Sequence, residues 1–316
     1  MQSSARIASL ILMVSGLVLV SPVRAQEQPA PECWELADEG DLTWSGCIFR
    51  PAAGALGNPD VIYLFTALGE KARSWIEEED ETEYADFRAA WPKLQTAFEG
   101  KGGHPQMNGG TQMTRALPTV VSITLDPANL SLLNDRRLAF FREKLLPTIE
   151  TKLGFNPAKR HLIGHSMGAF NAWRAATAPG ERVASLALEC PVLTPLGPVA
   201  TDKDIADVAR ANSADFQMVE FLVLGVKSNF ATAAEWEAAN PLTTADRGVL
   251  PKIPVFLAPN LDDQFGFFDG GHALHKTLNL GGYRLNYVPT PGQHCENMGG
   301  ARLAKFVFGV VSAHAK

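Results

Sequence analysis

The sequence predicts an α/β protein in which a doubly wound, mostly parallel sheet is covered by helices on both faces. Short apolar segments bounded by Pro, Gly or Asp alternate along the chain with longer segments of helical spacing. Most of the short segments are apolar on both faces, as is typical of strands that lie between two layers of helices. The chain has 316 residues. Because α/β folds often run to about 250 residues as one unit, residues 26–316 are expected to form a single domain.

Six short segments are the candidate strands of this sheet. A hairpin over residues 42–49 is expected to precede them and to open the sheet at its edge. The six segments are residues 61–65, 120–125, 161–164, 185–188, 255–257 and 284–288. The carboxyl ends of parallel strands meet at one edge of a sheet, and ligands of doubly wound folds bind beyond that edge.

Four longer segments have the spacing of helices that pack on a sheet. In the longest, Leu138, Phe141, Leu145, Ile149 and Leu153 recur at intervals of three or four residues, which places them on one helix face. The four segments are residues 83–98, 135–153, 169–178 and 270–280. Residues 66–82 and 100–114 interrupt the alternation, and their acidic or Gly-rich composition predicts surface loops.

Residues 195–250 form an insertion between two predicted strands. Helical patterns over residues 202–212 and 231–239 make this insertion a candidate lid or cap over the site. Its aromatic side chains either line a substrate pocket or form a small core of the insertion, and the pattern is compatible with both. They are Phe216, Phe221, Phe230 and Trp236.

Residues 1–25 are expected to be a signal peptide. Arg6 gives the segment a positive start, residues 7–20 are almost wholly apolar, and Val23-Arg24-Ala25 is typical of a cleavage site. A membrane-spanning helix needs about 20 apolar residues, and this run is shorter and is followed by Pro22. We therefore expect an exported protein, periplasmic or secreted, with no integral membrane span in the mature chain.

Composition also narrows the class of partner. The formal net charge is −6 and no segment is dense in Lys and Arg, so the electrostatic signature of a nucleic-acid-binding protein is missing. No Cys or His spacing resembles a zinc site. His272 and His275 could share a helix face, but a third ligand is not evident. We expect no nucleic-acid partner, no metal and no organic cofactor.

The four cysteines predict two disulfides in an oxidising compartment. Cys33 and Cys47 flank a turn-like segment, which suits a local staple. Cys190 follows the predicted strand 185–188 at its carboxyl end, and Cys295 lies on a loop expected over the same edge of the sheet. A bond between Cys190 and Cys295 would tie that loop to the sheet.

The strongest chemical signal is the segment Gly164-His165-Ser166-Met167-Gly168, between a predicted strand and a predicted helix. A sharp strand-to-helix turn projects a serine hydroxyl toward a base and an acyl carbon. Such a turn brings strand and helix so close that a Cβ atom two residues on either side of the serine would clash, which explains Gly164 and Gly168. The start of the helix also offers free N–H groups and the positive end of its dipole to a developing oxyanion.

A nucleophilic serine needs a base and an acid, which follow it along the chain in this type of fold. His294 comes directly after the last predicted strand, where a loop would lie over the carboxyl edge of the sheet, and is the candidate base. Asp262 and Asp263 both follow the strand 255–257, and one of them is expected to orient the imidazole. Glu189, at the end of the strand 185–188, is a further candidate for the acid.

Three motifs together resemble a known family. The chain is similar to the "putative esterases" of the α/β-hydrolase fold in these motifs. They are residues 164–168 with the Ala-rich helix after them, Asp263-Gln264-Phe265 and Gly292-Gln293-His294. That group includes S-formylglutathione hydrolases (esterase D), feruloyl esterases and mycolyltransferases. The resemblance implies an α/β-hydrolase fold, here with the helical insertion before the acid-bearing strand, and hydrolysis of esters or thioesters. It also implies a Ser-His-Asp triad and favours Asp263 over Asp262 as its acid.

The family also points to an oxyanion hole. In esterase D the early strand ends in Ser-Gly-Leu, and the leucine N–H helps to bind the oxyanion; this chain has Thr66-Ala67-Leu68 there. Leu68 and Met167 are therefore the candidate donors. Two departures accompany the resemblance: Ala67 replaces the family's glycine, and Gly69-Glu70 stands where the family has a characteristic cysteine. The expected export also argues against a cytosolic glutathione thioester as the substrate.

The resulting hypothesis is an exported serine esterase that acts on a small-molecule ester. Ser166 attacks the acyl carbon, His294 moves the proton, Asp263 holds the histidine tautomer, and water hydrolyses the acyl-enzyme. One alternative is an exported acyltransferase of the same fold, which excludes water and uses an alcohol acceptor. Another is a binding protein that has kept the fold without turnover.

Overall fold

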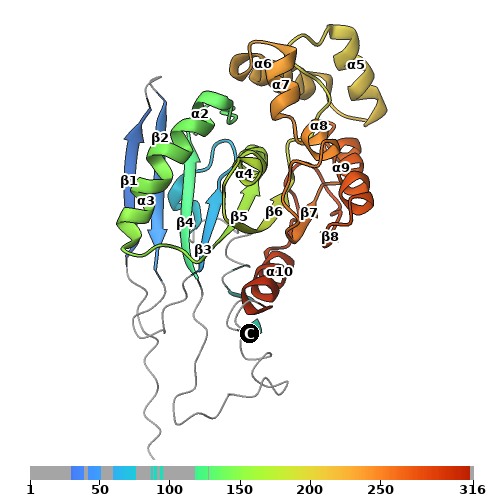
Figure 1. Ribbon diagram of the computed structural model, residues 1–316. Helices are drawn as coiled ribbons and strands as arrows, with labels where there is room; N and C mark the ends of the chain where they lie inside the picture. Colours follow the sequence, from blue (N-terminus) through green and yellow to red (C-terminus); the bar gives the residue numbers. More distant parts are fainter. Residues whose placement is uncertain are drawn as a thin grey trace, which may run out of the picture.

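Eight strands form one sheet in the part of the chain that the computed structural model describes, which is residues 30–38, 42–50, 60–75, 87, 89–90, 93–94, 118–126 and 128–313. Their spatial order is β1-β2-β4-β3-β5-β6-β7-β8 (Figure 1). The strands are β1 (Glu32–Ala37), β2 (Thr43–Phe49), β3 (Asp60–Phe65), β4 (Thr119–Leu125), β5 (Lys159–His165), β6 (Val183–Glu189), β7 (Val255–Ala258) and β8 (Leu285–Tyr287). The predicted signal peptide and the predicted loop over residues 100–114 lie outside the described residues.

The six predicted strands are present as β3 to β8, and neighbouring strands among them are parallel. The predicted fold class, a mostly parallel doubly wound sheet, is therefore confirmed. The strand order reverses at β3, which pairs with β4 on one side and β5 on the other. At such a switch point the connections leave in opposite directions and open a crevice at the carboxyl ends. The segments that follow β3 and β5 border this crevice.

The prediction of a hairpin over residues 42–49 is wrong in its extent. These residues form essentially one strand, β2, which pairs antiparallel with both β1 and β4. The hairpin consists of β1 and β2, with Cys33 opposite Cys47. Trp34 and Leu36 are half-buried and alternate with exposed residues, so this edge strand has no continuous apolar run and did not stand out in the sequence.

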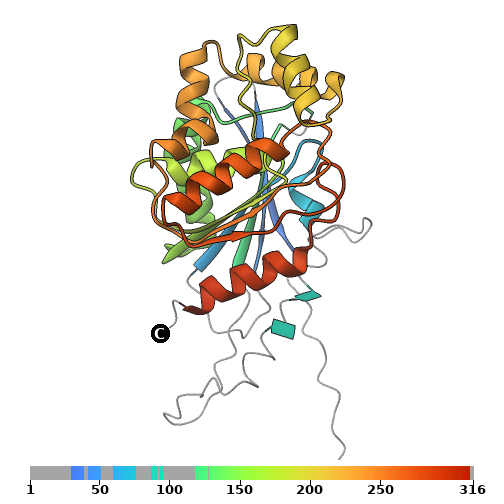
Figure 2. The same ribbon diagram turned by 90° about the vertical axis from the view of Figure 1, so that its right-hand side faces the viewer.

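The alternation of side chains along β3 separates the two faces of the sheet. Val61, Tyr63 and Phe65 face a core shared with α2, α3, α4 and α9, whereas Ile62 and Leu64 face α10. Figures 1 and 2 show α10 on its own side of the sheet. These helices are α2 (Asp135–Phe140), α3 (Leu146–Leu153), α4 (Met167–Thr177), α9 (Phe268–Leu280) and α10 (Gly300–Ala313).

The predicted helices agree with the structure where it describes them. The segment 135–153 is helical throughout, with a π-helical turn at Phe141–Leu145 between α2 and α3. Of the predicted helix over residues 83–98, only residues 87, 89–90 and 93–94 are described, and all are helical. The first part of the predicted loop over residues 66–82 contains a short 3-10 helix, η1 (Ala72–Trp75). Helix α10 was not predicted.

The insertion between β6 and β7 is helical and packs on α4. It contains α5 (Asp202–Ala211), α6 (Phe216–Asn229), α7 (Ala233–Ala239) and α8 (Pro241–Asp246), and Figure 1 places α5, α6 and α7 beyond one end of the sheet. Phe230 and Trp236 are buried against Phe170 of α4, with the Phe170 and Trp236 rings stacked at 5.7 Å. The exposed fractions of Phe216 and Phe221 are 39% and 45%.

Of these four aromatic residues, Phe230 and Trp236 belong to a core, as one of the two alternatives expected. This core joins the insertion to α4, whereas Phe216 and Phe221 are exposed. No helix in the described part of the chain is both long enough and apolar enough to cross a membrane.

Candidate active site

Ser166 lies at the tip of a sharp turn between β5 and α4. Its backbone has φ 53° and ψ −117°, a conformation that is costly for a residue with a side chain. A Cβ atom on Gly164 would overlap the carbonyl of Gly168 and the Cα of Ala169, and one on Gly168 would overlap the carbonyl of Phe65. Both glycines are therefore required by the close approach of strand and helix that the sequence predicts.

Gly168→Ala is expected to destabilise the fold by about 1–3 kcal/mol, because its methyl group can be accommodated only by moving the backbone of β3. The matched control is Gly309→Ala in α10, where an added Cβ meets no atom within 4 Å and alanine favours the helix by up to about 1 kcal/mol. Urea unfolding of both variants measures the difference. Equal stabilities for the two variants would contradict the packing argument.

The structure brings Ser166, His294 and Asp263 together in a hydrogen-bonded chain. Ser166 Oγ lies 2.7 Å from His294 Nε2, and His294 Nδ1 lies 2.7 Å from Asp263 Oδ2. The other carboxylate oxygen of Asp263 accepts the N–H of Phe265 at 2.9 Å. The side chains of His294 and Asp263 are 10% and 1% exposed, so water competes little for either hydrogen bond.

The histidine is held from several sides. Its backbone N–H donates to Gln264 Oε1 at 2.7 Å, and the rings of Phe265 and Phe267 lie edge-on to the imidazole at 4.9 and 5.3 Å. The sequence singled out Asp263 from its place after a strand, marked Gln264 and Phe265 only through the family resemblance, and did not single out Phe267. The segment after β7 therefore supplies both the candidate acid and the aromatic rings that pack on the candidate base.

The other candidates for acid and base lie elsewhere. Asp262 is exposed, and its carboxylate accepts the N–H of Gly292 at 3.3 Å. Glu189 is fully buried, and its backbone carbonyl accepts the N–H of Ser166 at 3.0 Å. Three other histidines follow Ser166 in the sequence: His272 and His275 are on α9, and residue 314 lies outside the described residues. Of the weighed acids, only Asp263 is hydrogen-bonded to His294 in the described part of the chain.

Two backbone N–H groups, one at the start of α4 and one in the turn after β3, have no acceptor among the described residues. Met167 is the first residue of α4, and no hydrogen bond involves its N–H among the described residues. In the turn after β3, the N–H groups of Thr66 and Ala67 donate to Ile123 O and Glu70 Oε2, at 3.1 and 2.8 Å. The next N–H, that of Leu68, has no acceptor among the described residues. The two N–H groups are those predicted for the oxyanion hole.

Both expected disulfides are present in the structure. Cys33 and Cys47 join β1 to β2, and Cys190 is bonded to Cys295 with their Cα atoms 5.1 Å apart. A ring nitrogen of His165 lies within 4.8 Å of the latter two sulfur atoms. Because the two sulfurs are bonded to each other, they offer no thiolate, and this group does not form a metal site.

Replacing Cys190 and Cys295 together by Ser is expected to lower activity and to lower the unfolding free energy by up to about 4–5 kcal/mol, since the bond closes a long loop. The two cysteines are 105 residues apart, and the second one is adjacent to His294. Replacing Cys33 and Cys47 by Ser is the control, because that bond spans 14 residues at a distant strand pair. Turnover and urea unfolding test both variants, and unchanged turnover without the Cys190–Cys295 bond would contradict the expectation.

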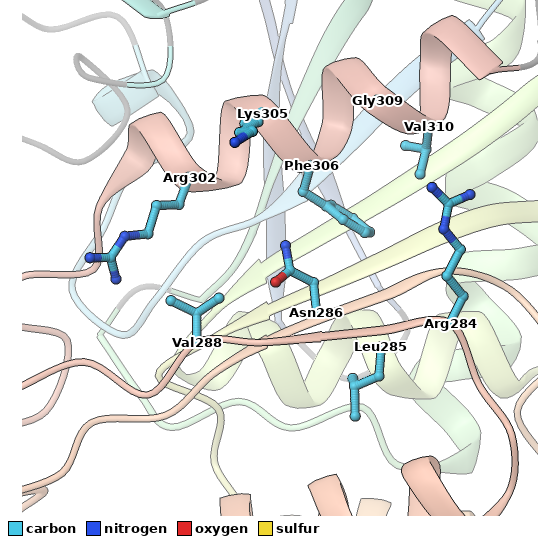
Figure 3. A pocket seen from close by; sticks show the side chains of 9 residues that line it. All are labelled: Arg284, Leu285, Asn286, Val288, Arg302, Lys305, Phe306, Gly309 and Val310. Carbon is cyan, nitrogen blue, oxygen red and sulfur yellow. The ribbon is translucent and has the colours of Figure 1, made fainter.

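A separate groove of about 510 Å³ lies between β8 and α10 (Figure 3). Its walls carry three cationic side chains over a partly apolar floor. The lining residues are Arg284, Leu285, Asn286, Val288, Arg302, Lys305, Phe306, Gly309 and Val310. None of them belongs to the Ser166 site, so this groove is not where that site would bind an acyl group.

The fold and the nucleophile elbow define an α/β-hydrolase-like protein, and comparisons with known proteins agree. The family described as "Putative esterase" matches residues 126–253, a stretch that contains the turn at Ser166 and the whole insertion. The resemblance expected from the sequence is thus confirmed. The match supports the predicted class of enzyme, a carboxylic ester hydrolase. No curated protein matches the sequence significantly.

Solved structures of esterases and lipases share the fold. A lipase in an open form superposes with a TM-score of 0.56 at 16% identity, covering 89% of this chain and 99% of the lipase. An S-formylglutathione hydrolase from Agrobacterium tumefaciens gives 0.55 at 12% identity, covering 90% and 98%. A ferulic acid esterase gives 0.53 at 14% identity, covering 90% and 99%. At these identities the likeness establishes the α/β-hydrolase fold.

Proposed function

We propose that this chain is an exported serine esterase that cleaves a small-molecule carboxylic ester through an acyl-enzyme. The observation that carries the proposal is the hydrogen-bonded chain from Ser166 through His294 to Asp263, with both links at 2.7 Å. It starts from a serine whose strained backbone projects the hydroxyl at the carboxyl edge of the sheet. This arrangement is what nucleophilic acyl transfer requires of a serine, a base and an orienting acid.

The proposed mechanism follows from the direction of each hydrogen bond. Asp263 accepts Nδ1–H of His294, which leaves Nε2 unprotonated to take the proton of Ser166. Ser166 Oγ then bonds to the acyl carbon, and the carbonyl oxygen becomes an oxyanion that the N–H groups of Met167 and Leu68 stabilise. His294 protonates the leaving alkoxide, and a water activated by His294 releases the acid. The two disulfides support an extracytoplasmic location for this reaction.

The insertion is proposed to act as a cap rather than as a separate domain. Its helices α5 and α6 share a small core of their own, and α6 and α7 contribute to the core that includes Met167 and Phe170 of α4. This contact joins the insertion to the helix that starts at the nucleophile. The insertion is therefore expected to shape the acyl pocket, whereas the loops at the carboxyl edge of the sheet supply the reacting side chains.

Trapping the acyl-enzyme tests the proposed function. The mature protein is mixed with p-nitrophenyl esters of rising chain length, beside a feruloyl ester and a glutathione thioester, quenched in acid and digested. The proposal expects a burst of p-nitrophenol and an acyl adduct on the Ser166 peptide. Turnover of every ester without an adduct at Ser166, or no turnover of any of them, would overturn it. Transfer to added alcohols in preference to water would instead identify an acyltransferase.

A further inference from the structure

The turn that follows β3 is connected to His165, the residue before Ser166, by the partly buried carboxylate of Glu70. Glu70 Oε2 accepts the N–H of Ala67 at 2.8 Å, and Glu70 N–H donates back to Ala67 O at 3.3 Å, which closes the turn over Leu68 and Gly69. The other oxygen, Glu70 Oε1, lies 3.1 Å from Nδ1 of His165. His165 is the last residue of β5 and precedes Ser166 directly.

This carboxylate spans the two segments from which the proposed oxyanion donors come. The Leu68 N–H belongs to the turn after β3, and the Met167 N–H belongs to the start of α4. These two segments border the crevice at the point where the strand order reverses, so the sheet brings them side by side without hydrogen-bonding them to each other. The Glu70–His165 contact supplies a polar link between them.

The surroundings of the pair favour a strong, well-oriented interaction. The side chains of Glu70 and His165 are 24% and 9% exposed, so solvent screens their interaction less than it would at the surface. Burial raises the pKa of Glu70. The hydrogen bond and charge interaction with His165, together with the Ala67 N–H, outweigh burial and hold the pKa below its usual value. Glu70 is therefore ionised at neutral pH and can accept both hydrogen bonds.

His165 also lies near the disulfide that restrains the loop of His294. One of its ring nitrogens lies within 4.8 Å of the sulfur atoms of Cys190 and Cys295, and Cys295 follows His294 directly. The ring thus lies between the turn that carries Leu68 and the disulfide that restrains the His294 loop. Loss of the Glu70 carboxylate would act directly on the donor turn, because Glu70 Oε2 accepts the Ala67 N–H of that turn.

We propose that Glu70, acting with His165, is a positioning residue that sets the separation between the Leu68 and Met167 N–H groups for the oxyanion. The inference rests on the proposed esterase function of Ser166. Oxyanion donors act on the transition state more than on the bound ester. Loss of the carboxylate therefore lowers kcat and leaves KM nearly unchanged. Glutamine can preserve the acceptor for the Ala67 N–H and is the conservative substitution.

The test compares Glu70→Ala, Glu70→Gln and Glu70→Asp in the mature protein, with p-nitrophenyl acetate as substrate. Glu70→Ala is expected to lower kcat by about 10- to 100-fold, somewhat less than the 10²–10³-fold typical of removing an oxyanion donor outright, with KM within about twofold. Glu70→Gln should recover most of that loss. Glu70→Asp should not, because its shorter side chain cannot reach both Ala67 and His165. A kcat for Glu70→Ala and Glu70→Asp equal to wild type would overturn the proposal, as would a change in KM alone.

A second measurement separates positioning from a general loss of stability. A trifluoromethyl ketone bonds to Ser166 Oγ, the serine proton passes to His294 Nε2, and the former carbonyl oxygen becomes an oxyanion. Its inhibition constant should rise by the factor by which kcat/KM falls across the Glu70 variants. If Glu70→Ala does not fold, Glu70→Gln and Glu70→Asp test the proposal through the same steady-state kinetics and the same inhibition constant.

The sequence contains a matched structural control at the opposite end of the same strands. Asp60 of β3 lies 3.4 Å from Nε2 of His161 on β5, and both are buried. Asp60→Asn perturbs a similar His–carboxylate pair between the same two strands, so it should lower Tm while kcat stays within about twofold of wild type. Comparable losses of kcat in Asp60→Asn and Glu70→Ala would assign Glu70 a merely structural role and overturn the proposal.

Ser166→Ala, assayed in parallel, keeps the two proposals distinguishable. Retained turnover in Ser166→Ala would contradict the proposed esterase function. Loss of turnover in Ser166→Ala, together with full activity in Glu70→Ala, would contradict only the positioning role of Glu70.

Discussion

Ser166→Ala is expected to lower kcat for a p-nitrophenyl ester by about 10⁴-fold or more, because the hydroxyl forms the covalent intermediate and no neighbouring group can replace it. In the structure Ser166 Oγ is the atom within 2.7 Å of His294 Nε2. Removing Oγ leaves the imidazole without its proton donor. Steady-state kinetics with active-site titration of the wild type measure the loss.

The variant should remain folded. Alanine removes one oxygen atom, and the backbone of residue 166 is held by hydrogen bonds that do not involve the side chain: its N–H donates to Glu189 O, and its carbonyl accepts the N–H of Ala169. Circular dichroism and urea unfolding should therefore match those of wild type to within about 1 kcal/mol. A folded Ser166→Ala protein with near wild-type turnover would contradict the serine mechanism.

Asp263→Asn is expected to reduce kcat by about 10⁴-fold, because an amide at this position favours the wrong tautomer of His294. The amide group can donate an N–H to Nδ1, which would place the imidazole proton on Nε2, and the protonated Nε2 cannot accept the serine proton. The side chain of Asp263 is 1% exposed, so water cannot substitute for the lost acceptor. The measurement is the pH–rate profile of kcat/KM for wild type and variant.

Asp262→Asn provides the neighbouring control for this substitution. Asp262 is exposed and accepts the N–H of Gly292, so the loss of its charge should change kcat by less than about tenfold, in line with the small effects of most surface substitutions. A larger loss in Asp262→Asn than in Asp263→Asn would reassign the acid. Mild effects of both substitutions would point to Glu189.

Local patterns in the sequence were sufficient for most strands and for the candidate nucleophile. Apolar runs predicted β3 to β7, because a strand buried on both faces must be apolar on both faces. Gly164 and Gly168 marked the elbow, because the steric need for glycine arises within a few residues of chain. Apolar runs and paired glycines depend only on residues close together in the sequence, so they can be recognised without knowledge of the fold.

Elements with weaker local signals were missed for the same reason. The edge strand β1 is half-buried on one face, through Trp34 and Leu36, and exposed on the other. Helix α10 contains Gly309, and its apolar residues pack on one face of β3, β5 and β7, including Ile62, Ile163 and Phe256. Its stability comes from that packing more than from intrinsic helix propensity.

The sequence by itself determined which residue types were available for catalysis and in what order they occur, whereas the tertiary structure decided which of them meet. Asp262 and Asp263 are adjacent in sequence. The direction in which the chain leaves β7 decides that Asp263, and not Asp262, forms the hydrogen bond with His294. Ser166 and His294 are 128 residues apart, and Glu70 and His165 are 95 apart. Contacts across such separations depend on the strand order β4-β3-β5 and on the shape of the loops beyond it, which no local periodicity encodes.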